Sequence, residues 1–354
     1  MRVGAPPQRD APVPAGGLRD LSPAYFGLVM ATGIVSLAAD MLGWPALARA
    51  LLALNTVQYV LLWGLFLLRA WRHPRRFFGD MVDHATGMGY FTVVAGTGIV
   101  ASQYIVLLDN VSVGFALWSL AALLWLALTY TIFTAFTIRR TKPALDRGIS
   151  GAWLLAVVST QALAVSSALL AARIGQPLRL ELNLLALSMW LWGGMLYIWM
   201  MALIFYRYLF FRFAPGDLAP PYWINMGAMA ISTLAGSLLI QNAPHAPFLT
   251  ALLPFLKGFT VFYWAAGTWW IPMLVLLGVW RYGVRRFPLA YDPLYWGAVF
   301  PLGMYAACTW QMDRAMEVGF LHTLPRLFFA VALVAWLLAF VGMLRSALRH
   351  LRAL

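Results

Sequence analysis

The sequence has little charge for its length. Asp, Glu, Lys and Arg together make up only 10% of the 354 residues, whereas 62% of the residues are hydrophobic. Soluble domains carry roughly 25% charged residues, because a folded surface must be wetted by water. The composition therefore excludes a soluble globular enzyme and predicts a protein that resides in a lipid bilayer.

The residues that usually build catalytic and metal sites are also scarce. The single cysteine, Cys308, can form neither an intramolecular disulfide nor a cysteine-based zinc or iron–sulfur site. His-Glu-x-x-His, Gly-x-Ser-x-Gly and Walker-type motifs are absent. The five histidines fall in loops or near the ends of the expected helices, which argues against a haem held between helices: His73, His84, His245, His322 and His350. We therefore expect no cofactor, no metal and no enzymatic activity.

Long apolar stretches are what the sequence does contain. A stretch of about twenty residues is long enough for an α-helix to cross roughly 30 Å of hydrocarbon. We expect a disordered cytoplasmic tail over residues 1–21, a transmembrane domain over 22–346 and a basic cytoplasmic C-terminus over 347–354. The transmembrane domain contains ten such stretches: 23–41, 46–69, 86–107, 113–137, 150–172, 184–209, 221–241, 257–280, 293–312 and 324–346. The predicted fold class is an all-α integral membrane protein.

The basic residues predict the orientation of these helices. The net charge of +13 would suggest nucleic acid in a soluble protein, but in a membrane protein basic residues mark cytoplasmic loops. Nineteen of the 25 Lys and Arg residues fall on one side of the ten stretches, and the other side holds only six: Arg49, Arg173, Arg179, Lys257, Arg314 and Arg326. We expect a multi-pass protein of the bacterial plasma (inner) membrane with both termini in the cytoplasm, and no nucleic-acid partner.

The odd-numbered stretches resemble copies of one another. Aromatic residues begin each of them at intervals of 62 to 73 residues, and the first two share the run Thr-Gly-Ile-Val at 32–35 and 97–100. Interfacial aromatic belts, which recur at every membrane crossing, are the alternative explanation for the aromatics alone. The shared run and the even spacing favour a true repeat of five helical hairpins arranged as a quasi-fivefold ring.

Small and hydroxyl-bearing residues alternate along the odd stretches, whereas the even stretches are more apolar. We expect the odd helices to line a central pore and the even helices to face lipid or a neighbouring subunit. For any single small residue, plain helix packing is the alternative. An uncharged path in a basic protein suits anions better than cations, because no acidic ring attracts a cation. The candidate pore-lining residues are Met30, Thr32, Gly33, Ala95, Thr97, Gly98, Val157, Thr160, Gly227 and Ser232.

One bulky residue interrupts this pattern. When the ninth stretch is aligned on the first, Phe300 falls at the level of mostly smaller residues: Met30, Ala95, Val157 and Gly227. Its phenyl ring would close a pore at that level, since a hydrophobic constriction blocks ions by dewetting. Pro301 lacks an N–H and leaves the Gly297 carbonyl without its helical partner, so this pair is a candidate hinge. An ordinary core phenylalanine is the alternative.

Four segments resemble the tellurite-resistance/dicarboxylate transporter family. They are LSPAYFGLVMATG at 21–33, YWINMGAMAIS at 222–232, GTWWIP at 267–272 and WGAVFP at 296–301. The family includes bacterial tellurite-resistance channel homologues, fungal malate and sulfite transporters, and the slow anion channels of plant guard cells. The resemblance covers residues 21 to about 346.

The resemblance implies five hairpins in a ring, a pore lined by the odd helices, a homotrimer with one pore per subunit and a gating phenylalanine at Phe300. The chain departs from the family at Gly303 and Met304, where a threonine is common. We expect an anion channel or facilitator for chloride- or nitrate-like anions and for C4 dicarboxylates. The alternatives are a proton-coupled malate or sulfite carrier that uses His84 or His322, and a membrane-embedded enzyme or electron carrier.

Overall fold

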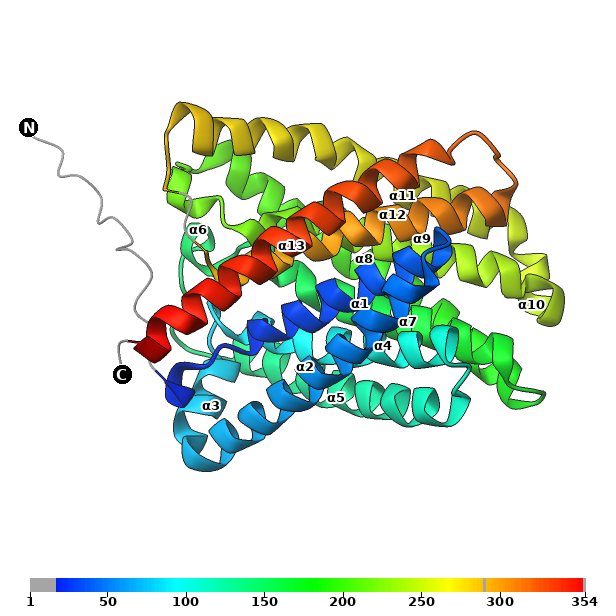
Figure 1. Cartoon of the computed structure of the whole chain (residues 1–354), viewed down its shortest axis with the longest axis horizontal. Helices are drawn as coiled ribbons and strands as arrows, with labels where there is room; N and C mark the ends of the chain where they lie inside the picture. Colours follow the sequence, from blue (N-terminus) through cyan, green and yellow to red (C-terminus); the bar gives the residue numbers. More distant parts are fainter. Residues whose placement is uncertain (1–16, 289–290, 353–354) are drawn as a thin grey trace, which may run out of the picture.

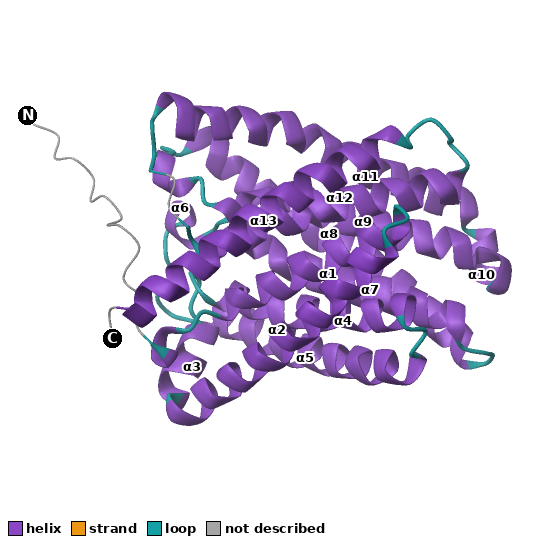
Figure 2. Ribbon diagram, viewed as in Figure 1, coloured by secondary structure: helices purple, strands orange, loops and turns teal. Residues whose placement is uncertain are grey.

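The chain folds into α-helices joined by short loops and 3-10 turns (Figures 1 and 2). The computed structural model describes residues 17–288 and 291–352, and these ranges contain no strand. The all-helical class predicted from the sequence is therefore confirmed for the described residues. The long helices are α1 (Phe26–Met41), α2 (Pro45–Arg72), α4 (Phe91–Leu107), α5 (Val111–Ile138), α7 (Leu155–Arg173), α8 (Leu178–Phe210), α9 (Ile224–Asn242), α11 (Leu253–Gly278), α12 (Trp296–Met316) and α13 (Thr323–Arg352). Three short helices connect them: α3 (Pro74–Met81), α6 (Leu145–Gly148) and α10 (Pro247–Ala251).

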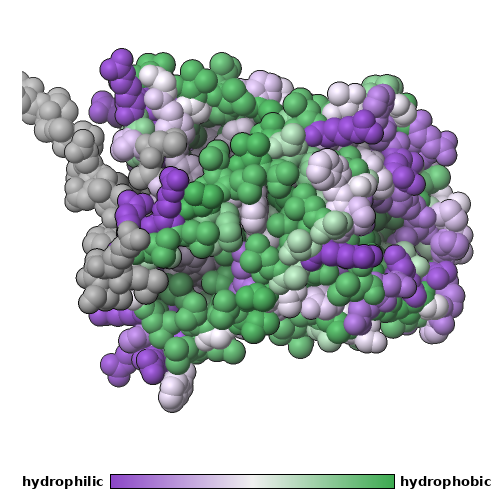
Figure 3. All heavy atoms as spheres, viewed as in Figure 1, coloured by the Kyte–Doolittle hydropathy of each residue, from purple (hydrophilic) through white to green (hydrophobic). Residues whose placement is uncertain are grey.

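The chain is a multi-pass membrane protein by the length and composition of these helices. Nine helices in the described ranges are long and apolar enough to cross a bilayer. The helix α12 is 21 residues long but less apolar, because Gln311, Asp313 and Arg314 lie in its last two turns. Figure 3 shows the apolar band across the middle of the molecule, with hydrophilic residues at the two ends. The tenth crossing expected from the sequence thus stays a prediction.

The long helices form an inner and an outer set. The inner helices α1, α4, α7, α9 and α12 contact one another in cyclic order, and α12 returns to α1. Each outer helix packs on the inner helix before it, as α2 does on α1 and α5 on α4. Sixteen of the 19 residues of α7 are buried, against five of the 28 residues of α5, so the outer set presents apolar side chains outward.

Small residues let the inner helices approach closely. A Cβ atom added to Gly98 would lie 3.2 Å from Ala162 Cβ on α7, and one added to Gly227 would lie 2.7 Å from Pro301 Cγ on α12. These contacts are the packing that small residues provide between membrane helices.

A hydrogen bond ties each outer helix to the inner helix of the next hairpin. In each case an aromatic side chain of the outer helix bonds an oxygen of the following inner helix. We call these the inter-hairpin bonds. They join Tyr59 Oη to Thr97 Oγ1 (3.0 Å), Trp125 Nε1 to Thr160 Oγ1 (2.8 Å), Trp190 Nε1 to the Ser232 carbonyl (2.8 Å), Trp264 Nε1 to Thr309 Oγ1 (3.0 Å) and Trp336 Nε1 to Thr32 Oγ1 (3.0 Å). The last of them joins α13 to α1.

The inner helices share a further feature, since a 3-10 turn directly precedes each of them. These entry turns contact one another in cyclic order, as the inner helices do. They are Pro23–Tyr25, Gly87–Tyr90, Gly151–Leu154, Pro220–Trp223 and Pro293–Tyr295. Proline occupies an early position in three of the turns, where its fixed φ is compatible with helix entry and its missing N–H leaves no bond unmade.

The structure adds detail at the two ends of the transmembrane domain, while the predicted domain limits stay a prediction. Residues 1–16 of the predicted tail lie outside the described residues, but Leu18–Asp20 form a 3-10 turn, and Arg69 Nε donates a hydrogen bond to the Arg19 carbonyl at 2.9 Å. At the other end, α13 continues past residue 346 to Arg352, because its last turns lack a helix-breaking residue.

Candidate functional site

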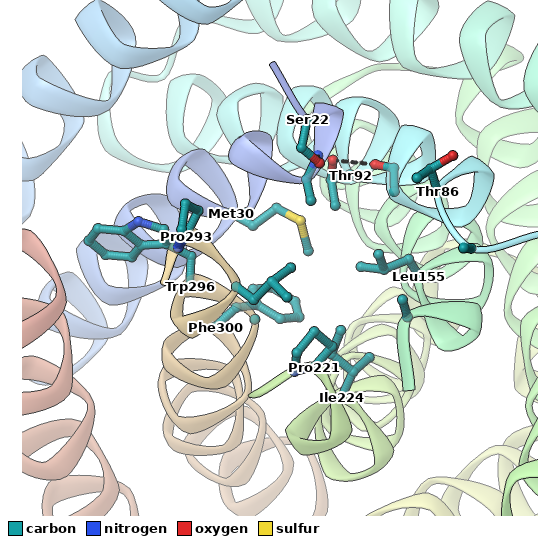
Figure 4. Close-up of a pocket in the computed structure, with 17 residues that line it drawn as sticks. Ser22, Met30, Thr86, Thr92, Leu155, Pro221, Ile224, Pro293, Trp296 and Phe300 are labelled. Atoms are coloured by element: carbon teal, nitrogen blue, oxygen red, sulfur yellow. Dashed lines mark hydrogen bonds between the residues drawn. The ribbon is translucent and has the colours of Figure 1, made fainter. Parts of the chain in front are cut away.

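The five entry turns surround a pocket at one end of the inner helices. Its volume is about 120 Å³, and every inner helix or its entry turn contributes to the wall. Figure 4 looks into this pocket, with Met30, Leu155, Ile224 and Phe300 around its centre. The full lining is Ser22, Ala24, Gly27, Met30, Ala85, Thr86, Gly89, Thr92, Ala152, Leu155, Pro221, Ile224, Pro293, Leu294, Trp296, Gly297 and Phe300.

Phe300 lies at the inner end of this wall. It belongs to the second turn of α12, and its side chain is only 1% exposed, while that of Met30 on α1 is 2% exposed. Pro301 follows within the helix and packs against Gly227 of α9. One turn earlier, Trp296 is fully buried and donates from Nε1 to Tyr291 Oη at 3.2 Å. The Phe300 side chain is therefore buried where α12 packs against α1 and α9.

The pocket is nearly apolar and carries no charged side chain. Its few hydroxyl groups are engaged in local structure: Thr92 Oγ1 lies 2.7 Å from the Pro23 carbonyl and 2.6 Å from the Gly89 carbonyl, and Ser22 Oγ accepts from the Ala24 N–H at 3.2 Å. The lining offers no carboxylate, imidazole or thiolate, which are the usual side-chain ligands of metals. Passage or binding of a small molecule fits such a wall better than acid–base chemistry does.

Three of the predicted site residues meet in this pocket, namely Met30, Gly297 and Phe300. Ala95 and Val157, predicted for the same level, are fully buried and do not contribute to the lining. Of the four residues aligned with Phe300, only Met30 lines the pocket with it, and the gating and pore-lining roles stay predictions.

The predicted hydroxyl residues have partners elsewhere. Thr32, Thr97 and Thr160 take part in the inter-hairpin bonds, which direct their Oγ1 atoms toward outer helices. Ser232 Oγ donates to the Ala228 carbonyl of its own helix at 2.7 Å. Gly33 faces Ile99 and Asn55, whose atoms would lie 2.3 and 2.8 Å from an added Cβ. Together with the contacts of Gly98 and Gly227, these partners give the small residues a packing role, and their exposure to a pore stays a prediction.

Sequence reasoning missed Leu155, Ile224, Pro221 and the linker residues Ala85 and Thr86. The repeat alignment that selected Phe300 also contained a signal for part of this group. One turn before the level of Phe300, it places Gly27, Thr92, Leu154, Ile224 and Gly297 together, and all of these except Leu154 line the pocket. The entry turns themselves were not predicted, because irregular loops carry no hydrophobic period.

Two buried arginines near the entry turns are neutralised within the protein. Arg69, at the end of α2, pairs with Asp80 and donates from Nη1 to Tyr90 Oη at 3.5 Å. Arg207, at the end of α8, lies 3.4 Å from Asp217 and donates from Nη1 to the Ile149 carbonyl at 3.2 Å. A buried charge needs such partners. These two guanidinium groups therefore fasten the entry turns and are not free to attract anions.

Comparison with known proteins identifies the family of the chain. The family of voltage-dependent anion channels, SLAC1, matches residues 20–344. A membrane protein of Mycobacterium tuberculosis without an assigned function is 38% identical over 149 residues, which cover 42% of this chain and 75% of that protein. A transporter of Methanocaldococcus jannaschii, also without an assigned substrate, is 23% identical over 297 residues, covering 82% of this chain and 84% of that protein. A sulfite efflux pump of the fungus Arthroderma benhamiae is 23% identical over 348 residues, covering 91% of this chain and 90% of the pump.

The family match runs from the first entry turn almost to the end of α13, so it includes every inner helix and the whole pocket. The match confirms the resemblance drawn from the four sequence segments. This chain belongs to the SLAC1 family of voltage-dependent anion channels.

Proposed function

We propose that the protein is an anion channel or facilitator that lets small anions pass down their electrochemical gradient. The observation that carries the proposal is the pocket at the entry turns, which every inner helix helps to build and which ends at the buried ring of Phe300. An uncharged wall does not hold an anion tightly, which is what conduction requires. Chloride- and nitrate-like anions are the proposed substrates, with C4 dicarboxylates as a further candidate.

In this proposal the five inner helices surround a conduction path, and ten crossings form a quasi-fivefold ring. The ring of Phe300 closes the path opposite Met30, and Pro301 with Gly297 forms the hinge on which that ring moves. The protein resides in the bacterial inner membrane with both termini in the cytoplasm, and it assembles as a homotrimer with one path per subunit. The cyclic contacts of the inner helices and of the entry turns support the ring of helices in this proposal.

The membrane potential supplies the driving force. Moving one charge through 100 mV releases about 2.3 kcal/mol, so an inside-negative cell drives anions outward without coupling to another ion. Selectivity then depends on the width of the path and on backbone dipoles, because the pocket wall carries no charge. Catalysis has no part in this proposal.

The test is the anion current of the parent protein and of Phe300→Ala in planar bilayers, with chloride, nitrate, malate and sulfite compared. Removing the ring opens the constriction, so we expect the chloride current to rise about tenfold or more, since a dewetted apolar constriction is the main barrier. The current should reverse near the equilibrium potential of the anion.

Phe91→Ala is the matched control, because Phe91 is a fully buried phenylalanine of the inner helix α4 that does not line the pocket. Phe91→Ala also removes one buried phenyl ring, but it should leave the anion current close to that of the parent protein. Equal currents from both variants would contradict a gating role for Phe300, and no anion current from any of them would contradict the channel itself.

A coupled carrier for sulfite or C4 dicarboxylates is the second candidate, favoured by the relative named as a sulfite efflux pump. Proton coupling would need a titratable group, and His84 lies in the linker next to the pocket, while His322 is exposed at the other end of the fold. This candidate predicts saturable uptake into vesicles that depends on a pH gradient. The double substitution of both histidines by glutamine should abolish that dependence, whereas a channel would be unaffected by it.

A further inference from the structure

A second pocket lies beside the first one, on the far side of the linker that precedes α4. Its volume is about 320 Å³, and Ala85 contributes to the walls of both pockets. The linker Asp83–Thr86 therefore separates the two spaces. The lining of the second pocket is Asp83, His84, Ala85, Arg139, Thr141, Lys142, Pro143 and Arg147.

This pocket has an excess of positive charge. Arg139, Lys142 and Arg147 contribute three cations, and Asp83 is the one acidic residue of its lining. Asp83 is already engaged, because its Oδ1 accepts from the Ala85 N–H at 2.9 Å and its Oδ2 lies 3.5 Å from Arg139 Nη1. Within the described residues, Lys142 and Arg147 have no carboxylate within 4 Å. The pocket thus carries two cationic groups that the protein does not neutralise.

Two sides of the pocket are fixed in place. Arg139 donates from Nη1 to the Val82 carbonyl at 3.1 Å, which holds its guanidinium at the start of the linker. The His84 ring stacks on Phe136 with ring centroids 4.0 Å apart and lies 6.3 Å from the Trp153 ring. His84 Nδ1 is buried and has no hydrogen-bond partner in the protein. A guanidinium and an aromatic-backed imidazole are therefore positioned before any ligand arrives.

We propose that this second pocket binds a phosphate dianion, either inorganic phosphate or the phosphate monoester of a lipid headgroup. Its two unneutralised cations match the two charges of the dianion. Arg147 and Lys142 supply several N–H donors, and guanidinium–phosphate pairs are among the stronger charge-assisted hydrogen bonds. The Thr141 hydroxyl adds a further donor at the rim. Chloride carries one charge and no set of oxygen atoms, so it uses these donors less completely.

An occupant of this pocket contacts the linker that also forms a wall of the first pocket. A phosphate bound at Arg147 and Lys142 would restrict the motion of residues 83–86 on the side of the linker that faces the second pocket. Ala85 and Thr86 of this linker also line the first pocket. The site is separate from the path that ends at Phe300, so the inference stands whether the transported anion is chloride, nitrate or sulfite.

The test is calorimetric titration of the full chain with sodium phosphate, in phosphatidylcholine nanodiscs at a pH where the dianion prevails. The variant is K142Q/R147Q. Its control is R72Q/R140Q, which removes two arginines that are also exposed but do not line the pocket. We expect saturable phosphate binding that the first variant weakens by about tenfold or more and that the control leaves nearly unchanged, because only the first removes direct partners of the ligand.

Equal weakening by the two variants would mean that diffuse surface charge attracts phosphate, and this result overturns the proposal. The proposal is also overturned if the parent protein shows no saturable phosphate binding, or if it binds chloride with the same affinity as phosphate. Nanodiscs that contain some phosphatidic acid identify the source. If that lipid weakens binding of inorganic phosphate to the parent, the headgroup occupies the pocket; if it does not, free phosphate is the ligand. The proposal is independent of the anion current of Phe300→Ala.

Discussion

At the scale of single residues, the contact between Gly227 and Pro301 holds the turn that carries Phe300. A Cβ atom at residue 227 would lie 2.7 Å from Cγ and 3.2 Å from Cα of Pro301. The proline ring is tied to the backbone and cannot rotate away. We expect Gly227→Ala to lower the free energy of unfolding by about 1–3 kcal/mol, as overpacking does in cores, and to raise the resting anion current by displacing Phe300. Thermal unfolding in detergent and bilayer recordings measure the two effects.

Gly64→Ala is the control for this substitution. Gly64 lies in α2, and no atom lies within 4 Å of its added Cβ. Alanine is favoured over glycine in a helix interior by about 1 kcal/mol, so this variant should be as stable as the parent or slightly more so. A resting current raised equally by both variants would contradict the role given to the Gly227 contact.

The titration of His84 gives a second prediction at this scale. Burial, together with the nearby Arg139 and Lys142, lowers the pKa of His84, and Asp83 opposes the shift only in part. The folded state therefore favours the neutral ring. As pH falls below the ordinary histidine value of about 6.5, the unfolded chain takes up a proton first, so this residue makes the protein less stable under acidic conditions.

The shift can be measured by NMR of ring-labelled histidine, with His84→Gln used to assign the signal. We expect the pKa of His84 to lie below that of a free histidine and to rise in Lys142→Gln, because one repelling cation is removed. Phosphate in the second pocket should raise the pKa of His84 too. An unshifted signal in both comparisons would argue against the proximity of these groups in solution.

At the scale of helices, the inter-hairpin bonds explain why hydroxyl residues occur on the inner set. In Thr32→Val, the Trp336 indole N–H on α13 would be left buried without an acceptor, which costs about 1–3 kcal/mol. Trp336→Phe removes the donor as well as some packing. We expect the double variant to be more stable than the sum of the two single changes predicts, as a thermodynamic cycle of unfolding free energies would measure. Strict additivity would mean that this bond contributes nothing.

The sequence was sufficient to predict the positions of the long helices. It was not sufficient to predict which neighbours the polar side chains of these helices contact. Length and hydrophobicity locate α2 or α5 without ambiguity, because each exceeds what a bilayer crossing needs. Thr32 and Thr97 were found by their repeat, but the repeat cannot indicate whether a hydroxyl faces an axis or a neighbouring tryptophan. That distinction depends on the rotation of each helix, and small residues on most faces of the inner helices leave the rotation unspecified.

The pocket also contains some residues that the sequence predicted and others that it did not. Alignment of the repeated helices placed Met30 at the level of Phe300, and both line the pocket, but Ala95, Val157 and Gly227 at the same level do not, so a gate at this level stays a prediction. Ala85 and Thr86 were not predicted, since a linker has no period and its position depends on tertiary contacts such as the hydrogen bond from Thr86 Oγ1 to the Asp80 carbonyl. The side-chain partners of Arg69 and Arg207 were hidden for the same reason.

At the scale of the whole molecule, orientation in the membrane is open to a direct test. The native thiol of Cys308 is fully buried, so it should not react with a membrane-impermeant maleimide. We expect Thr141→Cys to be labelled from the cytoplasmic side only and Glu181→Cys from the opposite side only, because the basic loops remain inside. Both replaced residues are exposed. Labelling of the two variants from the same side would contradict a membrane crossing by α7, and labelling with the two sides reversed would contradict the predicted orientation.

The inter-hairpin bond between Trp336 and Thr32 also bears on how the chain is made. Its two partners lie 304 positions apart, so α1 leaves the ribosome long before α13 exists to bond it. During synthesis, the face of α1 that later contacts α13 therefore has no protein partner until the last hairpin is inserted into the bilayer. The junction between α13 and α1 otherwise resembles the other four. A circularly permuted gene that begins at α3 and ends after α2, with residues 17 and 352 joined by a linker, would keep all five bonds. In that variant a different hairpin would be inserted before its neighbour is made.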